Sequence, residues 1–422
     1  MKFTDLKTFE YMAVQPKLAG LDEVQQMFLA FANGNHVALS GPPGVGKTTL
    51  VEEFASRLGI ELISRVMGPK VNESLLISYP DLVQENGVTV TKIRPGLLAQ
   101  ALQRNCIYFA DEIDRLTEDN QKLHNSAFDN RKSVTMRDGE RINGGNDFFG
   151  VVAYNPTEGL KHDLESALAD RFVHLNFQHF APKLEAFVSL QKAGLPASED
   201  LAGDIQWKVV RLSRKGNQKQ VQFYDLGLTK DQGVVLTDLF KGKQHDLSNA
   251  PAVSKDNQFI AYRSITSTGD DVAFINPSIL SLEELSIQLS EFCHDVRSVV
   301  EKGTHSLGAE LLSQMQSENE DVNFGKVQLH LPSSRILQAA LKQYHYLTTQ
   351  LGMPNGQAQV YTAMVVINQV GYGKFGTRKL GGATNKELLM ALAGTRNLIP
   401  MRKQRPLSSG KTGKRKGLKW GS

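Results

Sequence analysis

With 422 residues the chain is long enough for two or three domains, and its 41% hydrophobic and 22% charged residues are typical of a soluble globular protein. It has no run of eighteen apolar residues and no apolar signal core near Met1, so no membrane span and a cytoplasmic location are expected. The two cysteines lie far apart in the sequence, which makes a disulfide framework unexpected. The net charge of +4 is uneven, because residues 396–422 carry nine Lys or Arg and no acidic residue.

The first predicted elements surround a glycine-rich loop. Residues 1–20 read as an N-terminal lead-in, and apolar residues at helical spacing predict a helix over residues 21–33. A short buried strand is expected at residues 36–40, an amphipathic helix at residues 48–58 and a second strand at residues 61–66. Strand, loop and helix therefore follow one another in the order that phosphate binding requires.

The loop itself matches the P-loop pattern G-x-x-x-x-G-K-[ST]. Its glycines let backbone N–H groups turn toward phosphates, and the helix N-terminus adds a favourable dipole. Lys47 is expected to reach the β- and γ-phosphates, and the Thr48 hydroxyl is expected to ligate Mg²⁺. The predicted nucleotide-binding residues are Gly41, Pro42, Pro43, Gly44, Val45, Gly46, Lys47, Thr48 and Thr49.

A second chemical motif lies at the end of an apolar strand. A hairpin at about residues 84–94 and a helix at residues 97–103 lead to Cys106-Ile-Tyr-Phe-Ala-Asp-Glu112. An apolar run that ends in Asp-Glu is a weak signal alone, but its place after a P-loop favours a Walker B motif. Asp111 is then expected to bind Mg²⁺, and Glu112 is expected to polarise the attacking water.

Two more polar residues lie at element ends further along the chain. Strands are expected at residues 133–136 and 147–154, and the second ends in Asn155. The Asn155 amide can orient water beside the γ-phosphate, although an Asn-Pro pair is also a common turn former. A helix at residues 164–169 leads to Arg171, which can pair locally with a carboxylate or act as an arginine finger on a neighbouring subunit's nucleotide.

These motifs occur in one order along the chain. They are Ala19-Gly-Leu-Asp-Glu23, Gly34-Asn-His36, Gly41-Pro-Pro-Gly-Val-Gly-Lys-Thr48, Asp111-Glu-Ile-Asp114, Val134-Thr135, Ala153-Tyr-Asn-Pro156 and Ala167-Leu-Ala-Asp-Arg-Phe172. The series resembles the AAA+ ATPases of the MoxR branch, which includes helper ATPases that work on rubisco, nitric oxide reductase and cobalt chelatase. The resemblance covers residues 18–180 well and the segment after residue 277 loosely.

The resemblance implies an α/β P-loop NTPase fold, with a five-stranded parallel AAA+ core over residues 21–182 and a helical lid over residues 277–395. It implies ATP and Mg²⁺ as ligands, a homo-oligomeric ring, usually of six subunits, and a partner with a von Willebrand factor A domain. By motif position Asn155 would be sensor one and Arg171 the trans-acting finger. Arg335 would be the sensor-two arginine over the γ-phosphate, or else a solvent-facing arginine at a helix start. With Glu112 as the base, the predicted catalytic residues are Glu112, Asn155 and Arg171.

The chain departs from the family pattern between residues 197 and 276. Alternating apolar residues and polar turns there predict a small antiparallel β-rich insertion. Its expected strands lie at residues 205–209, 221–223, 233–236 and 259–265. The insertion would either contact a substrate or partner, or stiffen the lid, and the sequence leaves both readings open.

The basic segment at residues 396–422 is rich in Gly and Ser and is expected to be disordered. Such an arm can bind nucleic acid, with Trp420 stacking on a base, or serve only as a solubilising tail. The sequence therefore favours an ATP hydrolase that remodels or activates a client protein. A nucleic-acid translocase or loader that uses the tail is the alternative, and a nucleotide-gated scaffold fits less well because the Asp-Glu pair is intact.

Overall fold

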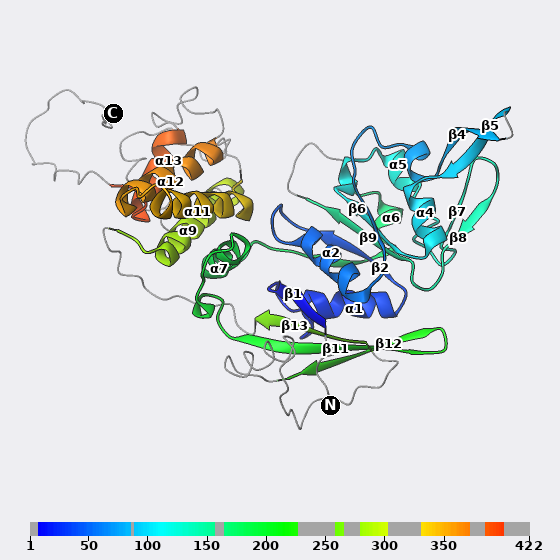
Figure 1. Ribbon diagram of the computed structural model, residues 1–422, viewed down its shortest axis with the longest axis horizontal. Helices are drawn as coiled ribbons and strands as arrows, with labels where there is room; N and C mark the ends of the chain where they lie inside the picture. Colours follow the sequence, from blue (N-terminus) through cyan, green and yellow to red (C-terminus); the bar gives the residue numbers. More distant parts are fainter. Residues whose placement is uncertain are drawn as a thin grey trace, which may run out of the picture.

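The structure, a computed structural model, describes residues 7–85, 88–156, 164–226, 258–265, 279–302, 331–371 and 385–400. Figure 1 shows an α/β core, a second sheet below it and a group of helices to one side. The expected β-strand at residues 233–236 and the basic segment beyond residue 400 lie outside the described residues.

The core is a five-stranded sheet in the order β10-β2-β9-β6-β3, and every neighbouring pair is parallel. The strands are β2 (His36–Ser40), β3 (Leu62–Val66), β6 (Ile107–Asp111), β9 (Phe149–Tyr154) and β10 (Phe172–Asn176). The central strands β2, β6 and β9 are buried, whereas Ser64, Arg65 and Val66 of the edge strand β3 are exposed. The predicted parallel core is confirmed.

Side chains alternate between the two faces of the central strands, as the pleat requires. Val37 and Leu39 of β2 lie in a hydrophobic cluster shared with helices α1 (Glu23–Ala32) and α2 (Lys47–Leu58), and Ala38 lies in a second cluster shared with α4 (Leu97–Arg104). The sheet is therefore covered on both sides. The residues that follow the carboxyl ends of the strands can then form a ligand site at that edge of the sheet.

The helix α1 begins with a capping box. The Asp22 carboxylate accepts a hydrogen bond from the Gln25 backbone N–H (2.9 Å), and the Gln25 side chain accepts one from the Asp22 N–H (3.1 Å). Helix α2 ends at Gly59, whose φ of 68° suits a glycine C-cap. Both helices were predicted, and their ends follow these capping signals.

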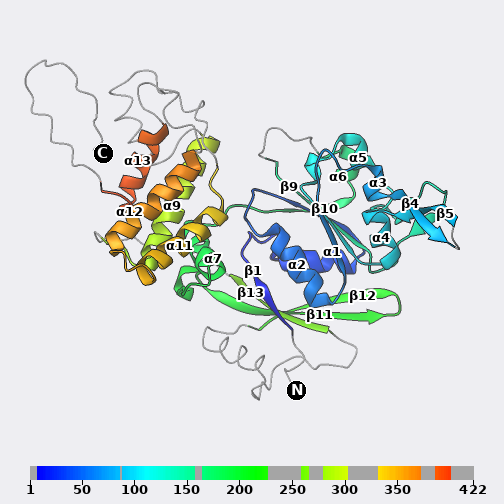
Figure 2. The same cartoon turned by 45° about the horizontal axis from the view of Figure 1, so that its top comes forward.

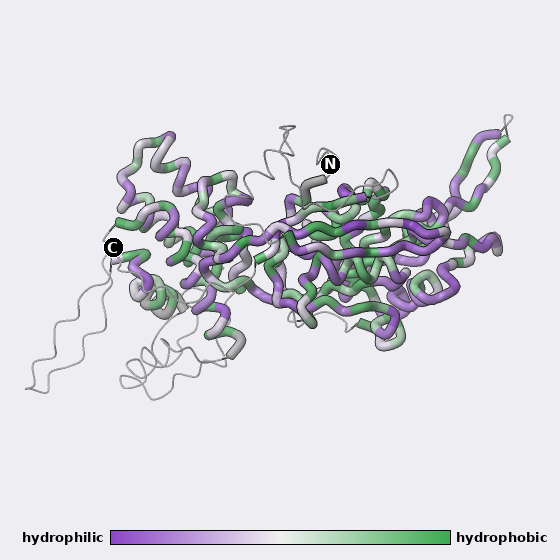
Figure 3. The backbone as a smooth tube through the Cα atoms, turned by 90° about the horizontal axis from the view of Figure 1, so that it is seen from below, coloured by the Kyte–Doolittle hydropathy of each residue, from purple (hydrophilic) through white to green (hydrophobic). Residues whose placement is uncertain are grey.

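The core also carries two hairpins and several short helices. The hairpin β4 (Ser78–Glu85) and β5 (Val88–Pro95) confirms the predicted one and projects from the molecule, as Figure 3 shows. The second hairpin joins β7 (Ser133–Thr135) to β8 (Arg141–Asn143). The short helices are α3 (Glu73–Leu76), α5 (Glu118–Lys122), α6 (Ser166–Ala169) and the 3-10 turn η2 (Ile113–Arg115).

The second sheet has four strands in the order β1-β13-β11-β12. Its strands are β1 (Lys7–Ala13), β11 (Ile205–Lys215), β12 (Gln218–Asp225) and β13 (Gln258–Ile265). The pairs β11–β12 and β11–β13 are antiparallel, as predicted, but β1 pairs with β13 in parallel. Part of the expected lead-in is therefore a strand, and the sheet is mixed rather than wholly antiparallel.

This mixed sheet packs on α1 and α2 (Figure 2). Phe28 of α1 and Phe54 of α2 pack on each other with ring centroids 4.8 Å apart, and the Lys219 ammonium of β12 lies 3.3 Å from the ring centroid of Phe31 of α1. Polar contacts add to the packing, because the Glu10 N–H donates to Glu53 (3.0 Å) and the Gln258 amide donates to the Arg57 carbonyl (2.7 Å). The helix that carries the end of the P-loop is therefore held between two sheets.

The helical part consists of α7 (Pro182–Lys192), α9 (Leu282–Lys302), α11 (Ser334–Thr349), α12 (Asn355–Gly371) and α13 (Asn385–Thr395). Helix α7, which was not predicted, packs on α9 and α11, so the helical lid includes residues that directly follow the core. At the C-terminal end of the lid, Arg396 donates to both oxygens of Asp295 (2.7 and 2.9 Å) and to Glu291 (2.6 Å), and Leu398 and Ile399 are buried, so the expected start of the disordered segment at residue 396 is too early. Among the helices that the structure describes, none combines the length and apolarity needed to cross a membrane.

A buried histidine at the start of β2 makes the stability of the core depend on pH. The His36 Nδ1 accepts a hydrogen bond from the Gly150 N–H (2.9 Å), and the ring lies against Phe128 and Phe148. Burial, with a smaller contribution from Lys132, lowers the pKa of His36 to about 3. The unfolded chain therefore binds a proton at a higher pH than the folded chain does, so stability falls as the pH drops below about 6.5.

We expect this histidine to reduce the free energy of unfolding by about 2 kcal/mol between pH 7 and pH 5. Urea unfolding at both pH values would measure the loss in the wild type and in His36→Asn, whose Oδ1 can still accept from Gly150. The Asn variant should lose less stability on acidification, whatever its stability at pH 7. An equal loss in both proteins would mean that His36 does not stay neutral.

Candidate functional site

The P-loop joins β2 to α2 at the carboxyl edge of the core sheet. Gly44 and Gly46 have φ values of 82° and 96°, which glycine adopts without strain. A Cβ on Gly41 would lie 2.3 Å from the Phe177 carbonyl oxygen, so no side chain fits there. The buried Val45 side chain anchors the loop in the core. The loop conformation therefore depends on the glycines that the motif provides.

Lys47 and Thr48 begin α2 beside the end of β6. The Lys47 ammonium donates to the carbonyl oxygens of Gly41 (2.5 Å) and Pro42 (2.8 Å), which places it inside the loop. The Thr48 hydroxyl donates to the Asp111 carboxylate (3.1 Å). A hydroxyl and a carboxylate are oxygen ligands of the kind that Mg²⁺ takes in P-loop sites. The residues present therefore fit a Mg²⁺–nucleotide complex.

Glu112 follows Asp111 in an uncommon backbone conformation. Its φ of 55° and ψ of 44° are left-handed, which is costly for a residue with a side chain. The carboxylate pairs with the Arg115 guanidinium (2.9 Å) and stays partly exposed to solvent. Backbone strain of this kind clusters at functional sites, because the surrounding fold holds it in place.

Asn155 lies at the same sheet edge as Asp111, because β9 and β6 are parallel neighbours. The side chain of Asn155 is buried, and its backbone N–H donates to the Asp114 carboxylate (3.4 Å). Asp114 is itself buried and belongs to the same Asp-Glu-Ile-Asp segment as Asp111. The structure therefore places the P-loop, Asp111, Glu112 and Asn155 at one edge of the sheet.

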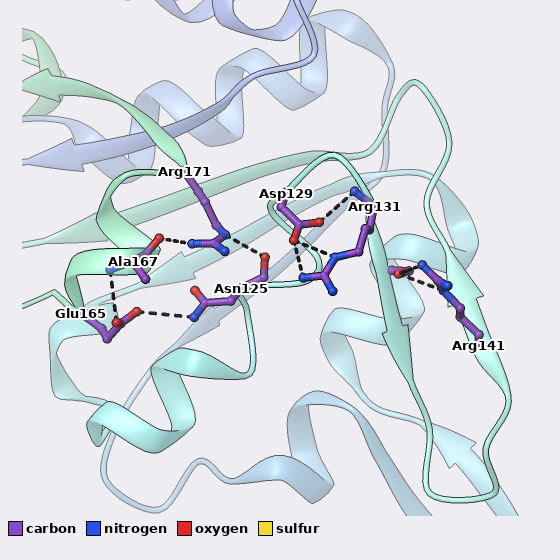
Figure 4. Close-up of polar contacts among 8 residues, drawn as sticks. Asn125, Asp129, Arg131, Arg141, Glu165, Ala167 and Arg171 are labelled. Atoms are coloured by element: carbon purple, nitrogen blue, oxygen red, sulfur yellow. Dashed lines mark hydrogen bonds and ion pairs between the residues drawn. The ribbon is translucent and has the colours of Figure 1, made fainter.

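Arg171 lies elsewhere in the same chain, in the polar cluster drawn in Figure 4. Its guanidinium donates to the carbonyl oxygens of Asn125 (3.0 Å) and Ala167. Next to it, the Arg131 guanidinium and the Asp129 carboxylate form an ion pair (2.5 Å). Arg171 is thus held in a defined position by backbone carbonyls.

The strand direction decides which nucleotide Arg171 can serve. Strand β10 begins directly after Arg171 and runs parallel to β2, with Phe172 opposite His36 and Asn176 opposite Ser40. The P-loop follows Ser40, so it lies at the carboxyl end of these strands and Arg171 lies at the amino end. Five residues of strand separate the two ends by roughly 16 Å. Arg171 therefore does not belong to the nucleotide site of its own chain.

The start of α11 lies against the P-loop. A Cβ on Gly44 would lie 3.3 Å from the Cβ of Ser333, which is the N-cap of this helix. Arg335, in the first turn, is exposed, and its charge adds to the burial that lowers the pKa of Lys192. The helix that was expected to carry the sensor-two arginine is thus at the site, while the role of Arg335 itself remains a prediction.

One contact to the P-loop and one group of contacts within the lid were not predicted. Tyr11 of β1 packs on the loop, because a Cβ on Gly46 would lie 3.2 Å from its ring, and its hydroxyl donates to the buried Glu23 carboxylate (3.0 Å). In the lid, Arg297 donates two 2.7 Å hydrogen bonds to Glu185 and one to the Pro332 carbonyl (2.8 Å). Both groups join residues far apart in the sequence, so no local pattern could have revealed them.

Comparisons with known proteins agree with this geometry. A family model described as "AAA domain (dynein-related subfamily)" matches residues 36–172. Protein CbbQ of Hydrogenophilus thermoluteolus is 27% identical over 42% of this chain and 66% of its own length. Denitrification regulatory protein NirQ of Pseudomonas aeruginosa is 30% identical over 41% of this chain and 65% of its own. Protein NorQ of Paracoccus denitrificans is 29% identical over 46% of this chain and 69% of its own length.

The first two alignments span just under two thirds of the relatives' length, and all three cover less than half of this chain. The match to the family model, residues 36–172, lies within the core and includes no strand of the mixed sheet and no lid helix. The matched segment holds the P-loop, the Asp-Glu pair, Asn155 and Arg171. Residues 36–172 therefore form an AAA ATPase domain that matches the dynein-related subfamily and is similar to CbbQ, NirQ and NorQ.

Proposed function

We propose that this ATPase forms a ring, usually of six subunits, and couples ATP hydrolysis at the subunit interfaces to the remodelling of a client protein. The main support is the position of Arg171 at the sheet end opposite the P-loop. An arginine held there serves hydrolysis only if a second subunit brings its nucleotide to it. A partner with a von Willebrand factor A domain is part of the proposal, on the resemblance to the MoxR branch.

Within one site, the P-loop amides and Lys47 bind the phosphates, and Asn155 and Glu112 act on the attacking water. Thr48 and Asp111 would hold Mg²⁺, which neutralises charge on the phosphates when it is bound. Glu112 accepts the proton of the water, and Asn155 fixes the direction of attack. Arg171 of the neighbouring subunit stabilises the charge that grows on the γ-phosphoryl group.

The first test is nucleotide binding by Lys47→Ala. We expect the loss of measurable ATP binding, because the variant lacks the ammonium that lies within the loop. Calorimetric titration with ATP would measure this, and Lys70→Ala, a change at an exposed lysine outside the loop, is the control. Unchanged ATP affinity in Lys47→Ala would contradict the assigned site. Hydrolysis that requires DNA or RNA would contradict the protein-remodelling proposal.

A further inference from the structure

His179 lies in the short connection between the core strand β10 and the first lid helix α7. The two residues before it, Phe177 and Gln178, are hydrogen-bonded to other parts of the chain. Phe177 donates its N–H to the Ser40 carbonyl (2.7 Å), directly before the P-loop, and its own carbonyl lies against Gly41. Gln178 exchanges two hydrogen bonds with the Gln15 side chain (2.7 and 3.3 Å). The His179 ring is therefore placed at the joint between the core and the lid.

Both ring nitrogens of His179 are buried, and neither has a hydrogen-bond partner among the residues that the structure describes. Buried polar atoms are nearly always paired, so an imidazole with two orphaned nitrogens needs an explanation. Among the residues that the structure describes, the buried histidines His36 and His124 are both paired. His36 accepts from Gly150, and His124 contacts the Tyr108 hydroxyl (3.1 Å). His179 differs from them in lying beside the candidate nucleotide site.

The charges around His179 come from both sides of the joint. Burial is the main reason that the pKa of His179 falls to about 4, and the positive charge of Arg297 is the next largest cause. The charges of His294 and Lys47 also lower this pKa, whereas the Glu185 carboxylate raises it. The ring is therefore neutral at pH 7, with one N–H donor and one acceptor nitrogen. Lys47 belongs to the P-loop, whereas Arg297 and Glu185 belong to the lid, so charged groups of both parts act on the ring.

The surroundings of this ring suit an anion. Lys47 is the P-loop cation, and the amino end of α11 lies against Gly44. The start of α11 is fixed through the lid, because Arg297 donates to the Pro332 carbonyl and Ser334 donates to Glu185 (3.0 Å). A nucleotide bound on the P-loop would thus meet groups whose positions the lid has already set.

On the basis of the proposed function, we propose that His179 is a further nucleotide-binding residue, whose imidazole N–H donates a hydrogen bond to a phosphate oxygen of the bound nucleoside triphosphate. The contact joins the nucleotide to the connection between core and lid. Binding then gives the orphaned donor its partner, and the position of the lid becomes sensitive to what the P-loop holds.

The test uses the full chain and His179→Phe, which keeps a ring but has no polar atom. Removing an unpaired buried polar group does not cost a hydrogen bond, so the nucleotide-free variant should melt at or above the wild-type temperature. The rise in melting temperature with saturating ATP should be smaller, and the Kd for ATP should increase about tenfold. His179→Gln, which keeps a donor, should recover part of the affinity. His174→Phe, at an exposed position on β10, is the matched control.

Competition by inorganic triphosphate locates the contact on the ligand. A similar loss of affinity for ATP and for triphosphate supports a phosphate contact, whereas a loss for ATP alone overturns it in favour of the base or ribose. Wild-type ATP affinity in His179→Phe overturns the proposal, and a lower melting temperature without nucleotide assigns the ring to stability instead. ATP binding by Lys47→Ala would contradict the proposed site as a whole, so the two failures can be told apart.

Discussion

Glu112→Gln is expected to bind ATP with wild-type affinity and to hydrolyse it about 10² to 10⁴ times more slowly. The amide has the shape of the carboxylate but does not accept a proton from water. It also keeps an oxygen that can accept from Arg115, which now pairs with Glu112 at 2.9 Å. The strained backbone at this position should therefore be maintained, and the loss should appear in kcat rather than in nucleotide affinity.

Steady-state phosphate release and a separate ATP-binding titration would measure the two effects. Glu118→Gln, which changes an exposed glutamate paired with Lys122, is the matched control and should hydrolyse ATP normally. Turnover at the wild-type rate in Glu112→Gln would remove Glu112 from its assigned role as the base. A loss of ATP binding together with turnover would point to a structural effect of the left-handed position.

Arg171→Ala is expected to reduce hydrolysis about 10³ to 10⁵-fold while each subunit still binds ATP through its own P-loop. The reason is the strand length that separates Arg171 from the P-loop of the same chain. In rings mixed from Arg171→Ala and Lys47→Ala subunits, some interfaces pair an intact P-loop with an intact Arg171. Such mixtures should therefore regain activity that neither variant has alone.

The mixing experiment separates a trans role from local structure, because Arg171 also donates to the Asn125 and Ala167 carbonyls. Arg131→Ala, which breaks the neighbouring ion pair with Asp129, is the comparison and should leave the melting temperature and ATP affinity unchanged. If the mixture of Arg171→Ala and Lys47→Ala has no more activity than its components, the arginine does not act across an interface.

The nucleotide site is the part of this protein that could be read from the sequence. The residue types of a P-loop and of a strand ending in Asp-Glu are set by local geometry, such as the positive φ of Gly44 and Gly46. Parallel strands then bring Asp111 and Asn155 to one edge, so separate local patterns predict a single site. The five-stranded parallel core sheet followed from the resemblance and is confirmed, whereas the order of its strands comes from the structure.

The parts that were missed depend on long-range pairing. No turn or cap within residues 7–13 marks them as a strand, and they form one by pairing with β13. Thr117 as an N-cap also predicts one helix through Phe128, but α5 ends at Lys122, because the N–H groups of residues such as Asn125 and Ala127 then bond three residues back. The Glu185–Arg297 pair joins two helices that are far apart in the sequence, and its two charges have no periodic signature.

The pairing of β1 with β13 also has a consequence for synthesis on the ribosome. Lys7 is opposite Ile260, so the first strand waits for its neighbour until the chain has grown past residue 265. At typical translation rates this delay is on the order of 10 to 50 s. During that time the outer faces of α1 and α2 lack their cover, although the P-loop is already made. A nascent chain of this protein is thus an expected client for a chaperone that shields apolar helices until the last strand emerges.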